Sequence, residues 1–131
     1  MSVVAPKKFR ILVVDDQAIV RRCICIMLAH DGHEVETASS GGKAMALFER
    51  NKFDLVLTDY VMPEMRGDEL VAAIKARAPK QPIVMVTADA EKLRESDRVP
   101  AGVDFLIGKP FSLEKLREAI ATVLPEKCLA E

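Results

Sequence analysis

The sequence predicts an α/β fold in which five parallel strands form one doubly wound sheet with helices on both faces. Short apolar runs rich in branched residues alternate five times with helical patterns, which is typical of successive βαβ units. Four of these runs lack polar alternation, as expected for strands buried on both faces. The 131 residues are enough for one such domain.

The strands follow from the apolar runs. A more polar run, HEVET, is predicted to form an edge strand at His33–Thr37. The other runs are predicted as buried strands at Phe9–Val14, Phe53–Thr58, Ile83–Val86 and Val103–Ile107.

Each strand is followed by a helical pattern. We expect Asp68 and Ser112 to cap two of the helices, and Pro79 and Pro125 to stop the same two. The weakest pattern lies at Glu91–Val99, because it has few large apolar residues. The predicted helices cover Gln17–Ala29, Lys43–Arg50, Glu69–Ala78, Glu91–Val99 and Leu113–Leu124.

Composition excludes several classes of protein. The 19 basic and 20 acidic residues give a net charge of -1, which argues against direct nucleic-acid binding through bulk charge. No apolar run approaches the length of a membrane span, and no signal peptide is evident, so we expect a cytoplasmic protein that does not bind membranes. We expect tails at residues 1–8 and 126–131, one domain at 9–125, and a monomer or weak dimer.

The cysteines and histidines do not indicate a metal or disulfide site. Cys23, Cys25 and Cys128 are odd in number and lack the spacing of a redox or zinc pair. His30 and His33 flank a predicted helix end and turn, where we expect solvated side chains.

Polar residues follow four of the strands. Asp15 and Asp16 come after the first strand, Asp59 after the third, Thr87 after the fourth and Lys109 after the fifth. Taken singly, each is typical of a turn, a cap or a charged surface. Because the carboxyl ends of parallel strands share one edge of the sheet, we expect these five side chains to meet.

Together these residue types indicate phosphoryl chemistry. Three converging carboxylates repel one another, and a hard cation with oxygen ligands such as Mg²⁺ would relieve that repulsion. An ammonium and a hydroxyl beside such an ion would hold a phosphoryl group, and an aspartate can itself accept that group as an acyl phosphate.

These residues lie in motifs that resemble the receiver domain of two-component response regulators, the CheY-like superfamily. The resemblance runs from about Phe9 to Leu124 and implies a flavodoxin-like (βα)5 fold. Its motifs are ILVVDD at 11–16, DYVMPEMRG at 59–67, VTA at 86–88 and KPF at 109–111.

The resemblance implies a metal site and an acceptor. Asp59 would accept a phosphoryl group from a phosphohistidine on a histidine kinase or phosphotransfer protein. Asp15, Asp16, Asp59 and the backbone carbonyl of Val61 would hold Mg²⁺.

The resemblance also gives roles to the neighbouring residues. Thr87 would bind a phosphoryl oxygen, and Lys109 would pair first with Asp59 and then with the phosphoryl group. A cis peptide is implied between Lys109 and Pro110, and Gly67 would relieve the turn before the third helix.

Three features bear on switching and on the lifetime of the phosphoryl group. Many receivers carry an aromatic residue where this chain has Leu106, and Phe105 is expected on the other face of the strand. The weak pattern at Glu91–Val99 is either a readout element near the fourth helix and fifth strand or a poorly packed surface helix.

Val61 and Asp89 occupy positions that control the access of the attacking water to the phosphoryl group. They favour a phosphoryl lifetime longer than that of the fastest response regulators.

The partner surface stays open in the sequence. In the family, the first helix and the loop after the fifth strand meet the phosphodonor. Ile19 and Cys23 beside the main stripe of that helix form either a docking patch or a wider core face, and the core face is the more usual case.

The expected function is a phosphoacceptor signalling module that catalyses only its own phosphorylation and dephosphorylation. Output would pass to a downstream protein target, or the chain would be a receiver excised from a larger regulator or hybrid histidine kinase. A flavodoxin-like cofactor binder is disfavoured because Asp15-Asp16-Gln17 would repel a cofactor phosphate. A phosphatase with an aspartate nucleophile is also disfavoured, because such enzymes have a D-x-D pair after the first strand, whereas Asp15 and Asp16 are adjacent.

Overall fold

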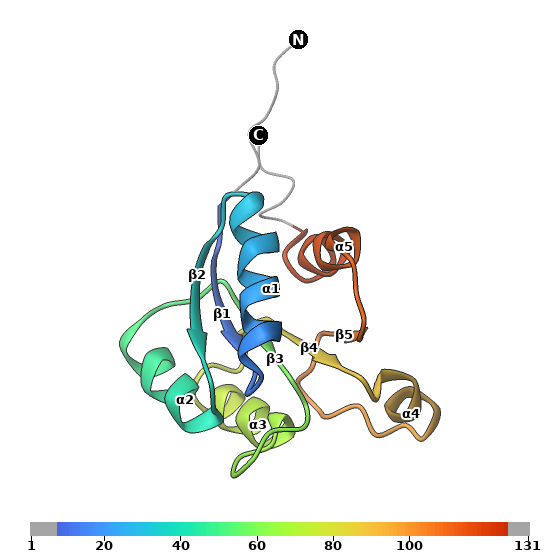
Figure 1. Cartoon of the computed structure of the whole chain (residues 1–131). Helices are drawn as coiled ribbons and strands as arrows, with labels where there is room; N and C mark the ends of the chain where they lie inside the picture. The colour runs from blue at the N-terminus through green and yellow to red at the C-terminus, as the bar shows by residue number, and fades with distance from the viewer. Residues whose placement is uncertain (1–7, 126–131) are drawn as a thin grey trace.

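The computed structural model describes residues 8–125. Its five strands and five helices alternate strictly along the chain (Figure 1). Cys128 and most of the predicted tails, at 1–7 and 126–131, lie outside the described residues. The elements are β1 (Arg10–Val14), α1 (Ala18–His30), β2 (Glu34–Ala38), α2 (Gly41–Arg50), β3 (Leu55–Thr58), α3 (Gly67–Arg77), β4 (Ile83–Thr87), α4 (Ala90–Glu95), β5 (Phe105–Gly108) and α5 (Leu113–Val123).

The strands form one parallel sheet in the order β2-β1-β3-β4-β5. This confirms the predicted doubly wound architecture and places the polar strand β2 at an edge. The chain order reverses between β1 and β3, so the loops after these two strands diverge and leave a crevice at their carboxyl ends. In register, Val14 at the end of β1 lies opposite Thr58 at the end of β3.

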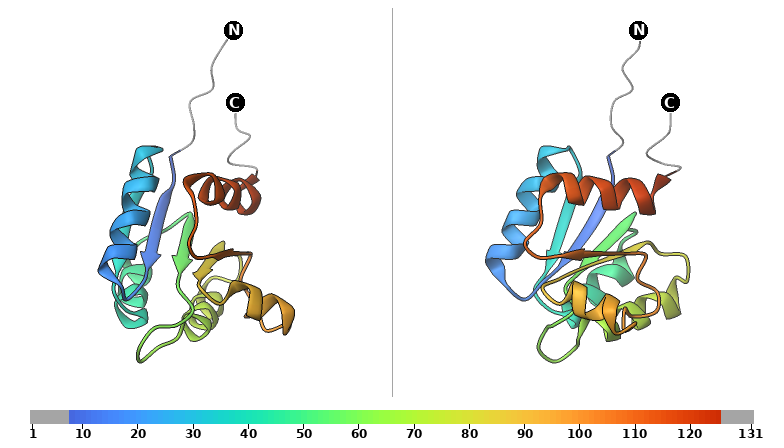
Figure 2. Two further views of the ribbon diagram at one scale, coloured as in Figure 1. Left: turned by 45° about the vertical axis from the view of Figure 1, so that its right-hand side comes forward. Right: turned by 90° about the vertical axis from the view of Figure 1, so that its right-hand side faces the viewer.

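Alternate residues of each strand pack on opposite faces of the sheet. Ile11 and Val13 pack with residues of α1 and α5, whereas Leu12 and Val14 pack with residues of α2, α3 and α4. The right-hand view of Figure 2 shows β5 at the edge of the sheet between α5 and α4. Burial on both faces explains the continuous apolar runs that predicted these strands.

Two helix ends differ in how they are capped. Ser112 caps α5 as predicted, because its side chain accepts a hydrogen bond from the backbone N–H of Lys115 at 3.2 Å. The prediction that Asp68 caps the third helix is wrong. The helix begins at Gly67, Arg66 is its N-cap, and Asp68 in the first turn instead forms an ion pair with Arg66 at 3.0 Å.

The fourth helix is shorter than the predicted Glu91–Val99. It ends at Glu95, and Asp97 then adopts a left-handed backbone conformation with φ of 56°. Ala90 and Leu93 are its buried side chains, so little apolar packing stabilises a helix longer than these six residues.

The prediction that His33 is solvated is also wrong, although His30 is exposed as expected. His33 is half-buried and stacks on Phe9 with ring centroids 5.3 Å apart. Its Nδ1 accepts a hydrogen bond from the backbone N–H of Phe9 at 3.1 Å. Burial lowers the pKa of His33, and the nearby Asp31 carboxylate opposes that shift in part.

Candidate phosphoacceptor site

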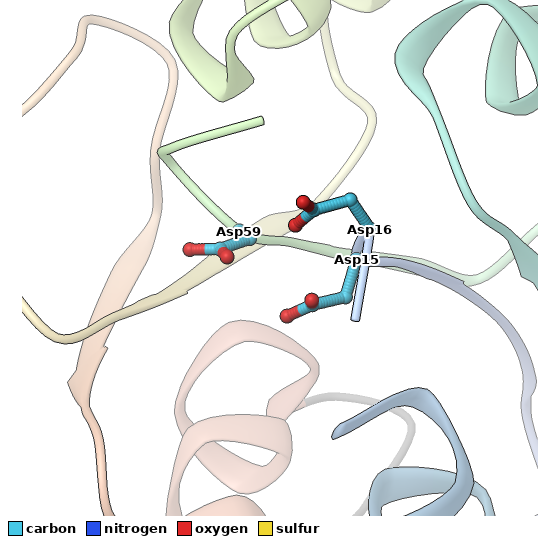
Figure 3. A group of neighbouring side chains, drawn as sticks. All are labelled: Asp15, Asp16 and Asp59. Atoms are coloured by element: carbon cyan, nitrogen blue, oxygen red, sulfur yellow. The ribbon is translucent and has the colours of Figure 1, made fainter. Parts of the chain in front are cut away.

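The three predicted carboxylates meet at the carboxyl ends of β1 and β3. Asp15 and Asp16 follow β1 and Asp59 follows β3, and one carboxylate oxygen from each lies within 4.8 Å of the others (Figure 3). Asp15 and Asp59 are 1% and 7% exposed, whereas Asp16 is open to solvent. The site therefore has two carboxylates buried away from solvent and a third at its opening.

Backbone groups fix the two buried carboxylates. Oδ1 of Asp15 accepts a hydrogen bond from the N–H of Gln17 at 2.9 Å, and Oδ1 of Asp59 accepts one from the N–H of Tyr60 at 2.7 Å. Each aspartate is thus held by the backbone that follows its strand, which orients its second oxygen toward the crevice.

Lys109 joins the two buried aspartates. Its Nζ donates to Oδ2 of Asp15 at 3.0 Å and to Oδ2 of Asp59 at 3.2 Å. Its backbone N–H donates to the carbonyl of Thr87 at 2.9 Å, and its peptide bond to Pro110 is cis. The ammonium therefore bridges β1 and β3 from the far edge of the sheet.

The charged groups of this cluster shift one another's pKa values. Burial would lower the pKa of Lys109, but the hydrogen bonds and negative charges of Asp15 and Asp59 outweigh burial and raise it. Burial raises the pKa of Asp59, Lys109 lowers it in part, and the like charge of Asp15 raises it further. The Lys109 ammonium therefore does not fully offset the loss of solvation that burial imposes on the Asp59 carboxylate.

Thr87 stands at the same edge, buried at the end of β4. Its Oγ1 accepts a hydrogen bond from the backbone N–H of Asp89 at 3.2 Å, which leaves its hydroxyl proton free to be donated. A cavity of about 270 Å³ lies beside Thr87 and most of the other predicted site residues. It is lined by Asp16, Gln17, Asp59, Val61, Thr87, Ala88, Asp89 and Lys109.

The donor set fits a hard divalent cation. Octahedral Mg²⁺ holds its oxygen ligands at about 2.1 Å, so that opposite ligands are about 4.2 Å apart. The spacing of up to 4.8 Å among the three carboxylates is close to that value. Val61 lines the same cavity, which is compatible with a role for its backbone carbonyl.

Sequence reasoning missed Arg21, which supports the site from α1. Its Nη1 donates to the backbone carbonyl of Asp15 at 2.7 Å. This contact depends on how α1 packs beside β1, and no local pattern in the sequence indicates it.

Residues 105 and 106 face opposite sides of β5, as the sequence predicts. Leu106 packs in the layer that contains Ala90 and Leu93 of α4, whereas Phe105 packs in the layer that contains α5. The carbonyl of Leu106 accepts a hydrogen bond from the side chain of Arg94. This bond ties α4 to the edge strand β5.

Of the two interpretations that the sequence left open for Ile19 and Cys23, the wider core face is not observed, because both side chains are exposed. Ile19 is 78% exposed, Cys23 is exposed, and Ile26 one turn further along α1 is 64% exposed. These side chains are spaced three or four residues apart, so they share one outward face of the helix.

A family model for the response regulator receiver domain matches residues 11–121. The chain belongs to this family. Receiver domains are signalling modules of two-component systems, so the resemblance found in the motifs is confirmed. Among residues 8–125, no helix is long and apolar enough to cross a membrane.

The receiver has relatives of several architectures. It is 38% identical over 125 residues to the alginate biosynthesis transcriptional regulatory protein AlgB of Pseudomonas aeruginosa, covering 95% of this chain and 28% of AlgB. It is 35% identical over 111 residues to the sensor histidine kinase RcsC of Salmonella typhi, covering 85% of this chain and 12% of RcsC. It is 32% identical over 123 residues to chemotaxis protein CheY-3 of Vibrio cholerae, covering 92% and 95%. The chain thus spans less than a third of the first two relatives.

Solved receiver structures share the fold. The response regulator TrrA of Thermotoga maritima, in complex with Mg(2+)-BeF, aligns with a TM-score of 0.80 and 31% identity, covering 89% of this chain and 99% of that one. A CheY-like receiver domain protein of Methanospirillum hungatei aligns with a TM-score of 0.83 and 33% identity, covering 92% and 97%.

Proposed function

We propose that Asp59 accepts a phosphoryl group from a phosphohistidine on a histidine kinase or phosphotransfer protein. The observation that carries the proposal is the position of Asp59, which shares Lys109 with Asp15 and opens onto the cavity beside Thr87. In the transfer, an Asp59 oxygen attacks phosphorus, the P–N bond to the donor breaks, and the histidine leaves with its electron pair and takes up a proton. The product is an acyl phosphate on Asp59.

Mg²⁺ held by Asp15, Asp16, Asp59 and the carbonyl of Val61 would neutralise negative charge on the transferred group. Lys109 would release the Asp59 oxygen and move its ammonium to a phosphoryl oxygen. Thr87 would donate its hydroxyl proton to another phosphoryl oxygen. Both groups already lie in the cavity, so they need only short movements.

We propose that the change reaches the surface through the loop after β4. Thr87 now accepts a hydrogen bond from the N–H of Asp89, the N-cap residue of α4. Movement of Thr87 toward a phosphoryl group would weaken that bond and bias the start of α4. The contact of Arg94 with the Leu106 carbonyl would pass this bias to β5 without an aromatic residue at position 106.

Val61 and Asp89 line the cavity, and we propose that the phosphoryl lifetime is longer than seconds. Val61 is 59% exposed and lines the cavity with an apolar surface that cannot orient water. The acidic side chain of Asp89 lines the same cavity beside Thr87. We assign the slow hydrolysis to Val61.

The exposed face of α1 formed by Ile19, Cys23 and Ile26 is the proposed docking surface for the phosphodonor. Output would pass to a downstream protein through α4 and β5. This assignment holds equally for a receiver that acts alone and for one within a larger regulator.

The proposed metal site can be tested through Tyr60. It is the one tyrosine in a chain without tryptophan, and its backbone N–H holds Asp59. We expect Mg²⁺ to change its fluorescence in a saturable way, and Asp15→Asn to weaken Mg²⁺ binding by about tenfold or more. Asp97→Asn, on an exposed turn, is the matched control and should bind as the unaltered protein does. Equal affinity of all three proteins for Mg²⁺, measured in parallel by calorimetry, would reject the proposed ligands.

A further inference from the structure

A second cavity of about 420 Å³ lies at the edge of the sheet, between β2, α2 and the start of α1. Three cationic side chains line it, one from α1 and two from α2: Arg21, Lys43 and Arg50. Figure 1 shows α2 beside the end of β2, the edge strand of the sheet. We call this cavity the basic groove.

Among residues 8–125, the cations of the basic groove have no carboxylate partners. Ion pairs within residues 8–125 involve other basic residues, and no carboxylate lies within 4.0 Å of a side-chain nitrogen of Arg21, Lys43 or Arg50. Three like charges in one cavity repel one another, and an anion placed among them would relieve that repulsion.

Two of the cations are already held by neutral groups. Arg21 donates one of its five N–H groups to the carbonyl of Asp15 at 2.7 Å, and its other donors remain for a ligand. Lys43 donates to the hydroxyl of Ser39 at 3.1 Å. Fixing these side chains before binding reduces the entropy that a ligand would have to overcome.

The spacing of the cations sets the kind of ligand. Lys43 and Arg50 are seven residues apart on α2, which places their backbones about 10 Å apart along the helix. Ala46 and Leu47 line the groove between them. A single phosphate group would fill only a small part of a cavity of about 420 Å³.

We propose that the basic groove binds a small molecule carrying at least two phosphate groups. Arg21 and Arg50 would hold phosphate oxygens with paired N–H donors, and Lys43 would contribute a third positive charge. Nucleoside triphosphates and inorganic pyrophosphate share this chemistry. The site is separate from the phosphoacceptor cavity and does not depend on the function proposed for Asp59.

Backbone amide NMR of the whole chain tests this proposal. The titrations use ATP, pyrophosphate, adenosine and hexaglutamate, with EDTA present so that no divalent ion recruits phosphate to the aspartates. We expect ATP and pyrophosphate to give saturable shifts at Ser39, Lys43 and Leu47. Combined Lys43→Gln and Arg50→Gln should weaken binding by about tenfold or more. Arg21 is left unchanged because it contacts Asp15. Lys80→Gln with Lys92→Gln, both exposed, is the matched control and should leave the affinity unchanged.

The four ligands and the two double variants distinguish the possible results. Tighter binding of ATP than of pyrophosphate assigns a nucleotide, and equal binding assigns an inorganic ligand; both support the site. The proposal is overturned by shifts that do not saturate below about 5 mM or by equal weakening in the control pair. It is also overturned if adenosine binds as well as ATP, or if hexaglutamate binds more tightly than either phosphate ligand, which would assign an acidic protein segment instead.

Discussion

Replacing Lys109 with Met is expected to slow phosphoryl transfer to Asp59 by roughly 10²–10³-fold. The side chain of Met has a similar length but no charge, so the phosphoryl group would lose the ammonium that now lies 3.2 Å from Asp59. Loss of that charge should tighten Mg²⁺ binding, because the carboxylates would have no other cation. Rates measured by intact mass during reaction with acetyl phosphate, alongside Mg²⁺ affinity, check both effects. Unchanged transfer in Lys109→Met would contradict the role assigned here.

The same substitution should destabilise the protein when Mg²⁺ is absent. Removing one partner of a buried ion pair typically costs about 3–5 kcal/mol, because the remaining charge is left uncompensated. Here two carboxylates would remain, 1% and 7% exposed. Mg²⁺ should restore most of the loss. Lys115→Met is the matched control, since Lys115 forms an exposed ion pair with Glu118 and should matter little.

The pH dependence of this loss follows from Asp59. Its pKa is raised in the fold, so the folded state holds that proton more tightly than the unfolded chain does. The contribution of Asp59 to the free energy of unfolding is therefore present at low pH. It is lost as the pH rises through the pKa that Asp59 has in the folded state. Lys109→Met removes a cation that lowers this pKa, so stability without Mg²⁺ should fall further with rising pH in the variant.

Replacing Gly67 with Ala is expected to damage both stability and the site. A Cβ at position 67 would lie 2.0 Å from the carbonyl oxygen of Asp59 and 2.8 Å from Cα of Tyr60. These are backbone atoms, and the N–H of Gly67 is held against the carbonyl of Tyr60 at 2.8 Å, so the β3–α3 loop itself would have to move. We expect a loss of about 1–3 kcal/mol or more in the free energy of unfolding, and weaker Mg²⁺ binding.

Gly42→Ala provides the matched control within α2. A Cβ at position 42 would meet no atom within 4 Å. Because Ala favours a helix over Gly by about 1 kcal/mol, this variant should be as stable as the unaltered protein or more so. Urea unfolding of both variants separates steric crowding at Gly67 from the general effect of replacing a glycine. Equal stability of the two variants would show that the loop has room for a side chain.

The predictable part of this molecule follows from a rule of parallel sheets. Strands that run the same way end at the same edge, so a polar residue after each buried run could be placed without knowing the helix packing. Asp15, Asp59, Thr87 and Lys109 meet for that reason. The same rule assigns no function to them; the roles above remain proposals.

The errors arose where tertiary contacts override local patterns. Asp is a residue type that often caps helices, but the close approach of Gly67 to the backbone of Asp59 starts the helix two residues earlier than predicted. His33 looks like a surface residue until β1 brings Phe9 against its ring. Ile19 extends an apolar pattern on α1, yet the sheet beneath that helix reaches only its inner face.

Arg21 and the basic groove could not be predicted for a related reason. Basic residues are spread along the sequence among nearly equal numbers of acidic ones, and which of them form ion pairs depends on the folded arrangement. Arg77 pairs with Glu49 across α3 and α2, while Lys43 and Arg50 on α2 form no ion pair with another described residue.

The most direct test of the central claim is the intact mass of the protein after incubation with Mg²⁺ and acetyl phosphate. We predict a gain of one phosphoryl group that requires Mg²⁺, is absent in Asp59→Asn and is retained in Asp97→Asn. The Asn variant should remain folded, because it removes a buried negative charge beside Asp15. A gain that survives in Asp59→Asn, or that does not require Mg²⁺, would contradict the assignment of Asp59 as the acceptor in a metal-assisted site.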